Sequence, residues 1–132
     1  MRIVRWGHYG VPLLLFPTAG GDPEEVERFH LIGKLRPFID EGCLKVYSID
    51  SLNGRIWLTH PDIAHRVWIH QQFSEYVRQE VVPWIRRDCQ SREMQIITAG
   101  ASIGALNALN SVCRDPDIFR AAICMSGTYD IQ

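Results

Sequence analysis

The sequence lacks several features that would indicate whole classes of protein. Its formal net charge is only -1, so no strong basic or acidic excess points to nucleic acid or to a membrane surface. Its longest apolar run, residues 11–17, is far shorter than the roughly 20 residues of a membrane span. No signal peptide, repeat or low-complexity tract is recognisable. We therefore expect a cytoplasmic protein that binds neither nucleic acid nor a membrane.

The sequence also has little that could bind a metal ion. Its four cysteines form no Cys-x-x-Cys pair, and none is spaced with a histidine as in a zinc site. We expect Cys43, Cys89, Cys113 and Cys124 to be reduced thiols. The composition is that of a globular domain, with 132 residues, 46% of them hydrophobic and 22% charged. Residues 1–132 are predicted to form a single domain.

Short apolar strands alternate with helical segments along the chain. Residues 11–16 form a continuous apolar run before a Gly-rich loop, which is typical of a buried strand. Asp22 is the expected N-cap of the first helix, and Pro83 should kink or end the second. Strands are predicted within residues 1–8, 11–16, 44–50, 94–99 and 119–125, and helices within 23–39, 62–87 and 103–113. This order favours an α/β fold with a mostly parallel sheet, helices on both faces, and ligands beyond the carboxyl ends of the strands.

One pattern carries chemistry: Gly100-Ala101-Ser102-Ile103-Gly104 matches the Gly-x-Ser-x-Gly nucleophile elbow. In this motif, a serine occupies a sharp, strained strand-to-helix turn that projects its hydroxyl above the sheet. Gly100 and Gly104 are small because the turn brings their backbones together. A β-rich run precedes the motif and a helical run follows it, which is the context that the motif requires. The alternative is a Gly-rich turn in which Ser102 only caps the helix.

A serine nucleophile also needs an oxyanion hole. One donor is predicted to be the backbone N–H of Ile103, at the N-terminus of a helix. The other should come from residues 18–21, where small residues let the backbone approach a developing oxyanion. Gly20 and Ala19 both fit, and the sequence does not separate them. A simple turn at the end of the strand is the alternative.

Several stretches together resemble the putative-esterase family of α/β-hydrolases. They are residues 7–8 with 11–21, 46–51, 75–77 with 80–83, 98–105 and 125–130. The family includes esterase D-like enzymes, feruloyl esterases and mycolyltransferases, and the resemblance is closest to a bacterial subgroup. It implies a carboxylic-ester hydrolase that forms an acyl-enzyme on Ser102 with a Ser-Asp-His triad. It further implies a small-molecule ester substrate, no metal and no organic cofactor.

One departure from this family concerns the acid and the base. The triad runs in the order Ser, Asp, His, yet only about thirty residues follow Ser102, and they include no histidine. We therefore expect the N-terminal part of an α/β-hydrolase three-layer sandwich, truncated after the strand that follows the nucleophile helix. A sheet cut there exposes an unpaired apolar edge. A homo-oligomer or another complex that covers this edge is expected.

Other residues are weaker candidates for the site. The five histidines all precede the nucleophile, and each is more easily explained as structural or solvated than as the base. Asp50 follows the second buried strand and Asp130 follows the last one, so either could line the site or serve as the acid. Trp57 is a candidate for an acyl pocket, whereas Trp68 and Trp84 fit a core-facing helix. The histidines are His8, His30, His60, His65 and His70.

Two other functions remain open on this fold. A non-catalytic relative could keep the elbow and bind a ligand or partner, which the missing triad residues favour. An acyltransferase would pass the acyl group to an alcohol instead of water. Nothing in the sequence identifies the acyl group or the alcohol of a substrate.

Overall fold

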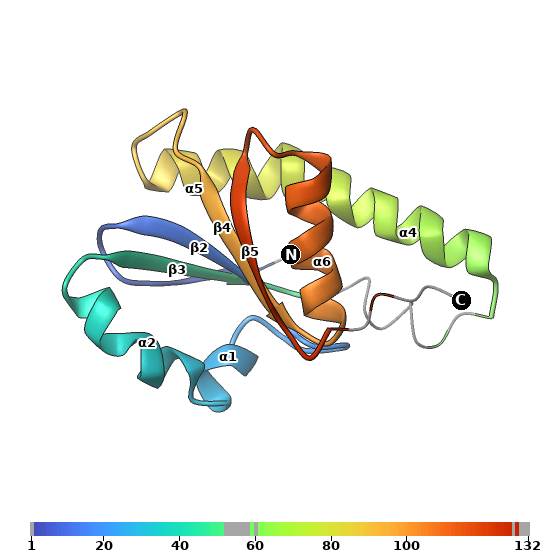
Figure 1. Cartoon of the computed structure of the whole chain (residues 1–132), viewed down its shortest axis with the longest axis horizontal. Coiled ribbons are helices and arrows are strands. Elements are labelled where there is room, and N and C mark those ends of the chain that lie inside the picture. Colours follow the sequence, from blue (N-terminus) through green and yellow to red (C-terminus); the bar gives the residue numbers. More distant parts are fainter. Residues whose placement is uncertain (1, 52–58, 60, 128, 130–132) are drawn as a thin grey trace.

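In the described part of the chain, five strands form one sheet in the order β1-β3-β2-β4-β5 (Figure 1). The computed structural model describes residues 2–51, 59, 61–127 and 129. Strand β1 pairs with β3 in antiparallel fashion, and the other neighbouring strands are parallel. The strands are β1 (Ile3–Trp6), β2 (Val11–Phe16), β3 (Leu44–Ile49), β4 (Ile96–Ala101) and β5 (Phe119–Met125). The predicted mostly parallel sheet is confirmed.

Helices cover both faces of this sheet (Figure 1). Successive residues of β2 point to opposite faces, so Leu15 packs with Ile32 on one side and Leu14 packs with Val81 on the other. A strand buried on both faces needs a continuous apolar run, which is why β2 could be predicted. The first face carries α1 (Glu25–Arg28) and α2 (Leu31–Asp40), and the second carries α4 (Ile63–Tyr76), η1 (Val77–Val81), α5 (Val82–Asp88) and α6 (Ile103–Arg114).

The single helix predicted over residues 23–39 is wrong, because the structure has two helices there. His30 adopts a left-handed φ of 64° between the end of α1 and the start of α2. Phe29, an apolar residue within the predicted helix, is 70% exposed at this break. Asp22 accepts the N–H of Glu24 at 3.1 Å, but the N-cap position of α1 is Glu24 itself. The spacing of apolar residues does not reveal a helix break that depends on the positive φ of one non-glycine residue.

The long helix predicted over residues 62–87 is confirmed. Asp62 caps it by accepting the N–H of Ala64 at 3.0 Å. Its middle contains the π-helical turn η1, directly before α5, where Pro83 lies in the first turn. Proline has no N–H to donate, and its ring crowds the carbonyl four residues earlier, so a wider turn relieves the crowding. The kink expected at Pro83 therefore takes the form of a π-helical turn.

Only part of the predicted core face of this helix is buried. Phe73 and Ile85 are buried, as expected from their spacing. Trp84 is 38% exposed, although its ring packs edge-to-face on Tyr47 with centroids 5.9 Å apart. Trp68 is 53% exposed, so its placement in the core was wrong. It lies five residues before Phe73, a spacing that places the two side chains on different sides of a helix.

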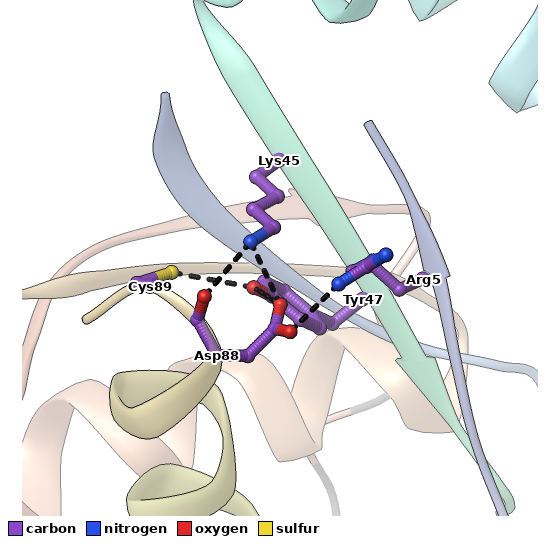
Figure 2. Close-up of polar contacts among 5 residues, drawn as sticks. All are labelled: Arg5, Lys45, Tyr47, Asp88 and Cys89. Carbon is purple, nitrogen blue, oxygen red and sulfur yellow. Dashed lines mark hydrogen bonds and ion pairs between the residues drawn. The ribbon is translucent and has the colours of Figure 1, made fainter. Parts of the chain in front are cut away.

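A polar cluster fixes the end of α5 to the sheet (Figure 2). The carboxylate of Asp88 accepts hydrogen bonds from Lys45 Nζ at 2.8 Å, Tyr47 Oη at 2.6 Å and Arg5 Nη1 at 2.7 Å. Tyr47 Oη also lies 3.2 Å from Cys89 Sγ. Burial, and then its bond to Asp88, raises the pKa of Tyr47 far above the ordinary value. Although burial alone would raise the pKa of Asp88, its bonds to Lys45 and Tyr47 lower it overall.

Strand β5 is an edge of the sheet and has only β4 as a described neighbour. Its side chains Ile123 and Met125 are 52% and 38% exposed. The unpaired apolar edge predicted from the sequence is present in the described structure. No helix within the described residues has both the length and the apolarity to cross a membrane.

Candidate active site

Ser102 lies on the sharp turn between β4 and α6. Its backbone angles are φ 57° and ψ -122°, a region that L-residues rarely adopt and that costs on the order of 1–3 kcal/mol. Two hydrogen bonds hold the turn: Ser102 N–H donates to the Met125 carbonyl at 3.1 Å, and the Ser102 carbonyl accepts the N–H of Ala105 at 3.0 Å. The structure thus has the strained turn of a nucleophile elbow, while the role of Ser102 as nucleophile stays a prediction.

The two glycines of the motif lie where no side chain fits. A Cβ on Gly100 would lie 2.3 Å from the carbonyl group of Gly104. A Cβ on Gly104 would lie 2.3 Å from the carbonyl oxygen of Phe16 and 2.8 Å from that of Pro17. Such contacts are impossible without moving backbone. The end of β2, the end of β4 and the start of α6 therefore meet at this turn because both positions are glycine.

Ile103 is the first residue of α6 and is buried. The first N–H groups of a helix have no acceptor within the helix, and the helix dipole is positive at this end. Ala105 and Ala108 are fully buried, so small side chains allow α6 to pack closely on the sheet. The predicted oxyanion donor Ile103 thus belongs to a helix start that packing holds in place.

The loop after β2 holds the other predicted oxyanion donors. Gly21 N–H donates to the Thr18 carbonyl at 2.9 Å, which makes Ala19 and Gly20 the central residues of a tight turn. Gly20 has a φ of 72°, which glycine adopts without strain. This loop is joined to the end of β3, because Ser51 N–H donates to the Gly21 carbonyl at 3.2 Å.

Glu25 holds this loop in place and was not singled out from the sequence. Its carboxylate accepts the N–H of Thr18 at 2.8 Å and the Thr18 hydroxyl at 2.5 Å. It is only 8% exposed, and it fills the space that a Cβ on Gly21 would occupy, with its carboxylate 2.6 Å from that position. In the sequence, Glu25 is one of three glutamates near the start of the predicted helix, where the helix dipole favours acidic residues. Nothing in this pattern distinguishes a carboxylate that folds back onto a loop.

An apolar cavity of about 240 Å³ lies beside the elbow. Ala101, the residue before Ser102, lines it together with Gly100 and Met125. Thr18 and Glu25 supply the polar part of its wall, and the remaining walls come from the end of β2 and from residues in and between α1 and α2. The cavity could take an apolar group next to the strained serine.

No hydrogen bond among the described residues joins a histidine to Ser102. His8 lines a different cavity with Lys45 and Asp88, and His30 is exposed between α1 and α2. His65 stacks on Trp68, with ring centroids 5.8 Å apart. Nε2 of His70 lies 3.1 Å from Oδ1 of Asn107, and burial lowers the pKa of His70 although this contact opposes the shift. His60, like Trp57 and Asp130, lies outside the described residues.

Of the two candidate acids, Asp50 and Asp130, only Asp50 lies within the described residues. It directly follows β3, at the carboxyl end of the strand, as the sequence suggested for a site-lining residue. Its Oδ2 accepts the N–H of Arg2 at 3.4 Å, a weak contact. This contact is with the N-terminal segment, and the hydroxyl of Ser102 has no hydrogen bond to Asp50 among the described contacts. A role for Asp50 in the site stays a prediction.

Solved structures resemble this fold at low sequence identity. A ferulic acid esterase matches with a TM-score of 0.62 at 22% identity, over 91% of this chain and 46% of that one. Enterochelin esterase from Shigella flexneri matches with a TM-score of 0.62 at 21% identity, over 96% and 32% of the two chains. MGS-MChE2, an alpha/beta hydrolase from the metagenome of lagoon sediments at Mar Chica, Morocco, matches with a TM-score of 0.57 at 17% identity, over 96% and 48%.

These matches show the fold, which is that of the α/β-hydrolases, as the sequence predicted. The chain spans less than half the length of each of these three proteins. A comparison with curated protein sequences finds no match. A family model described as Putative esterase matches residues 64–132, a segment that includes β4, Ser102 and α6. Because this match covers more than half of the chain, the protein belongs to the putative esterase family.

Proposed function

We propose that this chain carries the nucleophile of a serine esterase, which hydrolyses a carboxylic ester through an acyl-enzyme on Ser102. One observation carries the proposal: Ser102 adopts φ 57° and ψ -122° on a strand-to-helix turn. A strained turn of this kind presents a serine hydroxyl at the top of the sheet in serine hydrolases. Membership in an esterase family supports the proposal, and so does the resemblance in fold to a ferulic acid esterase and an enterochelin esterase.

In the proposed reaction, Ser102 attacks the ester carbonyl after a base removes its proton. The N–H of Ile103 and an N–H from the loop after β2 stabilise the oxyanion. Ala19 and Gly20 remain the two candidates for the second donor, as from the sequence, and both lie at the centre of the turn that the Gly21 N–H closes on the Thr18 carbonyl. One such donor contributes on the order of 3 kcal/mol to transition-state stabilisation. The ester bond then breaks, and the alcohol leaves with the proton that the base took from Ser102. Water, deprotonated by the same base, releases the acid from Ser102.

Among the described residues, no hydrogen bond joins a histidine to Ser102, so the base of this reaction is a matter of proposal. We assign it either to His60 or to a second polypeptide segment that packs on the edge of β5. The exposed side chains of Ile123 and Met125 support such a segment, because an unpaired apolar edge strand readily pairs with another strand. A homodimer would cover the edge with a second copy. Light scattering of the purified chain should then give a mass of at least two chains, and a stable monomer would contradict this part of the proposal.

The test of the nucleophile is labelling with a fluorophosphonate probe, which reacts with activated serines whatever their substrate. The native chain should be labelled, and Ser102→Ala should not. Ser126→Ala is the matched control, because Ser126 also has a positive φ, of 46°, and follows the neighbouring strand β5. Labelling of the control should equal that of the native chain.

Two results would contradict the proposal. If the probe still labels Ser102→Ala but no longer labels Ser126→Ala, the reactive serine is Ser126 and not Ser102. Absence of labelling in the native chain, with its fold intact by circular dichroism, would leave Ser102 without a base and would favour a non-catalytic binding protein.

A further inference from the structure

Four arginine side chains line one cavity at the end of the sheet opposite Ser102. The cavity has a volume of about 630 Å³ and is lined by Arg78, Arg86, Arg87 and Arg92. We call it the Arg groove. Arg92 precedes β4, whereas Ser102 follows it, so the two sites are separated by the length of a strand, about 20 Å. The groove is therefore distinct from the proposed active site.

Three elements bring these arginines together. Arg78 belongs to the π-helical turn η1, and Arg86 and Arg87 belong to the last turn of α5. A π-helical turn changes the direction of the side chains that follow it, and such turns are frequent at functional sites. Arg92 comes from the loop between α5 and β4. Side chains distant along the helix thus share one groove.

The loop at the groove contains a strained residue. Gln90 has a left-handed φ of 54°, at the position after a helix where glycine is favoured. Two hydrogen bonds hold it there: Gln90 N–H donates to the Arg87 carbonyl at 3.1 Å, and Ser91 N–H donates to the Arg86 carbonyl at 3.0 Å. Gln90 is itself one of the residues that line the groove. A strained residue in the wall of a cavity is a candidate for a functional role.

The arginines are only partly neutralised. Arg78 forms a long ion pair with Asp115 at 3.5 Å, and Arg86 Nε donates to the Met94 carbonyl at 3.2 Å. Arg87 and Arg92 form no ion pair with any other described residue. A helix dipole explains cations in the last turn of α5, but it explains neither Arg78 nor Arg92. The groove thus has a surplus of positive charge in a protein whose net charge is -1.

The remaining walls define the kind of ligand. Val82, Pro83 and Ile118 give the groove an apolar part, and Gln90 and Ser91 add uncharged donors. The volume suits a small molecule, since ligand sites commonly enclose about 300–1,000 Å³. Guanidinium groups bind phosphate through pairs of parallel hydrogen bonds. We propose that the Arg groove binds a small organic phosphate that has an apolar portion. This proposal does not depend on the esterase proposal.

The test uses phenyl phosphate as the probe, followed by NMR of the full chain. Amide shifts should move at residues 78–92 and at Ile118, and inorganic phosphate should bind several-fold more weakly. The double variant Arg87→Ala/Arg92→Ala should bind about tenfold more weakly, since each charge-assisted bond contributes substantially. The double variant Arg87→Lys/Arg92→Lys should bind phenyl phosphate with an affinity between those of the native chain and the double alanine variant, because lysine keeps the charge without the paired hydrogen bonds. Arg36→Ala, in α2, is the matched control and should bind like the native chain.

A second variant separates binding from stability. Gln90→Gly should raise the melting temperature by about 3 °C, because glycine adopts the left-handed conformation freely, yet weaken phenyl phosphate binding. Vesicles with and without phosphatidic acid distinguish a lipid headgroup from a free phosphate, and loss of either interaction in the double alanine variant supports the site. Two results would overturn the proposal: no shift at about 10 mM phenyl phosphate, or equal affinity in the native chain and the double alanine variant.

Discussion

The two ends of the parallel sheet hold their polar groups by different means. At the carboxyl end, Ser102 lies on a strained turn of the backbone. The chain packs so closely there that positions 100 and 104 have no space for a side chain and must be glycine. At the amino end, charge holds the structure together: Asp88 binds Lys45 and Arg5 (Figure 2). Five consecutive residues therefore specify the turn in the first region, although distant segments pack on it, whereas residues far apart in sequence build the second.

This difference predicts different responses to substitution. The turn fixes the position of Ser102, the proposed nucleophile, and its strain has to be balanced by packing around α6. The cluster at Asp88 instead fixes the end of α5 on β3, and the Arg groove lies next to it. Removing a glycine should therefore disturb one end through sterics, and removing a carboxylate should disturb the other through electrostatics.

The largest expected effect comes from Gly104→Ala. Its Cβ would lie 2.3 Å from the Phe16 carbonyl oxygen, which belongs to the backbone and cannot move aside cheaply. We expect the free energy of unfolding to fall by about 3 kcal/mol or more, as measured by urea denaturation. Gly33→Ala is the control, because Gly33 lies at an exposed position of α2 where a Cβ meets no atom within 4 Å, and it should stabilise this helix by roughly 0.5–1 kcal/mol. Equal effects of the two variants would show that the turn is not tightly packed.

The second effect comes from Asp88→Asn at the other end. Lys45 is only 6% exposed and would keep its charge with a weaker partner. We expect a loss of about 2 kcal/mol, less than the 3–5 kcal/mol of a fully buried pair because Asp88 is 18% exposed. Asp22→Asn, which breaks the exposed pair with Arg28, is the matched control and should change stability little. A loss no greater than that of the control would mean that the cluster does not anchor α5.

The first of these regions could be predicted from the sequence and the second could not. The elbow is local: five consecutive residues specify its turn, and the flanking run and helix confirm it. The cluster at Asp88 joins residues separated by 43 and 41 positions, and no spacing rule connects them. The Arg groove depends on a π-helical turn, which apolar periodicity does not show.

Other failures have the same physical origin. The break at His30 depends on one backbone conformation, and the inward orientation of Glu25 depends on a loop that it contacts through Thr18. By contrast, the central strands followed from apolar runs that must be buried on two faces. Sequence patterns thus predict what is periodic or contiguous, and they miss contacts that tertiary packing creates.

A third, smaller effect is the change at low pH in the stability that Asp88 contributes. The bonds of Asp88 to Lys45 and Tyr47 hold its pKa below the ordinary value of 3.8, in spite of burial. A carboxyl with a lowered pKa in the folded state stabilises the fold above its ordinary pKa, and this contribution disappears as pH falls through the folded-state pKa. The stability difference between the native chain and Asp88→Asn should therefore be constant near neutral pH and shrink once the pH falls below 3.8. Urea denaturation over this range measures it, and a constant difference would contradict the assignment.

The smallest effect tests whether α6, the helix that follows Ser102, is also sensitive to charge. Burial lowers the pKa of His70 below 6.5, so the folded state favours the neutral ring, whose Nε2 contacts Asn107 of α6. Protonation of the unfolded chain should therefore reduce stability as pH falls from 6.5, a window well above that of Asp88. His70→Gln can donate to the same oxygen without titrating and should lose less stability between neutral pH and this window. If stability depends on pH with the same slope in both proteins, packing and not charge supports α6. Charge would then stabilise the amino end of the sheet and sterics the carboxyl end.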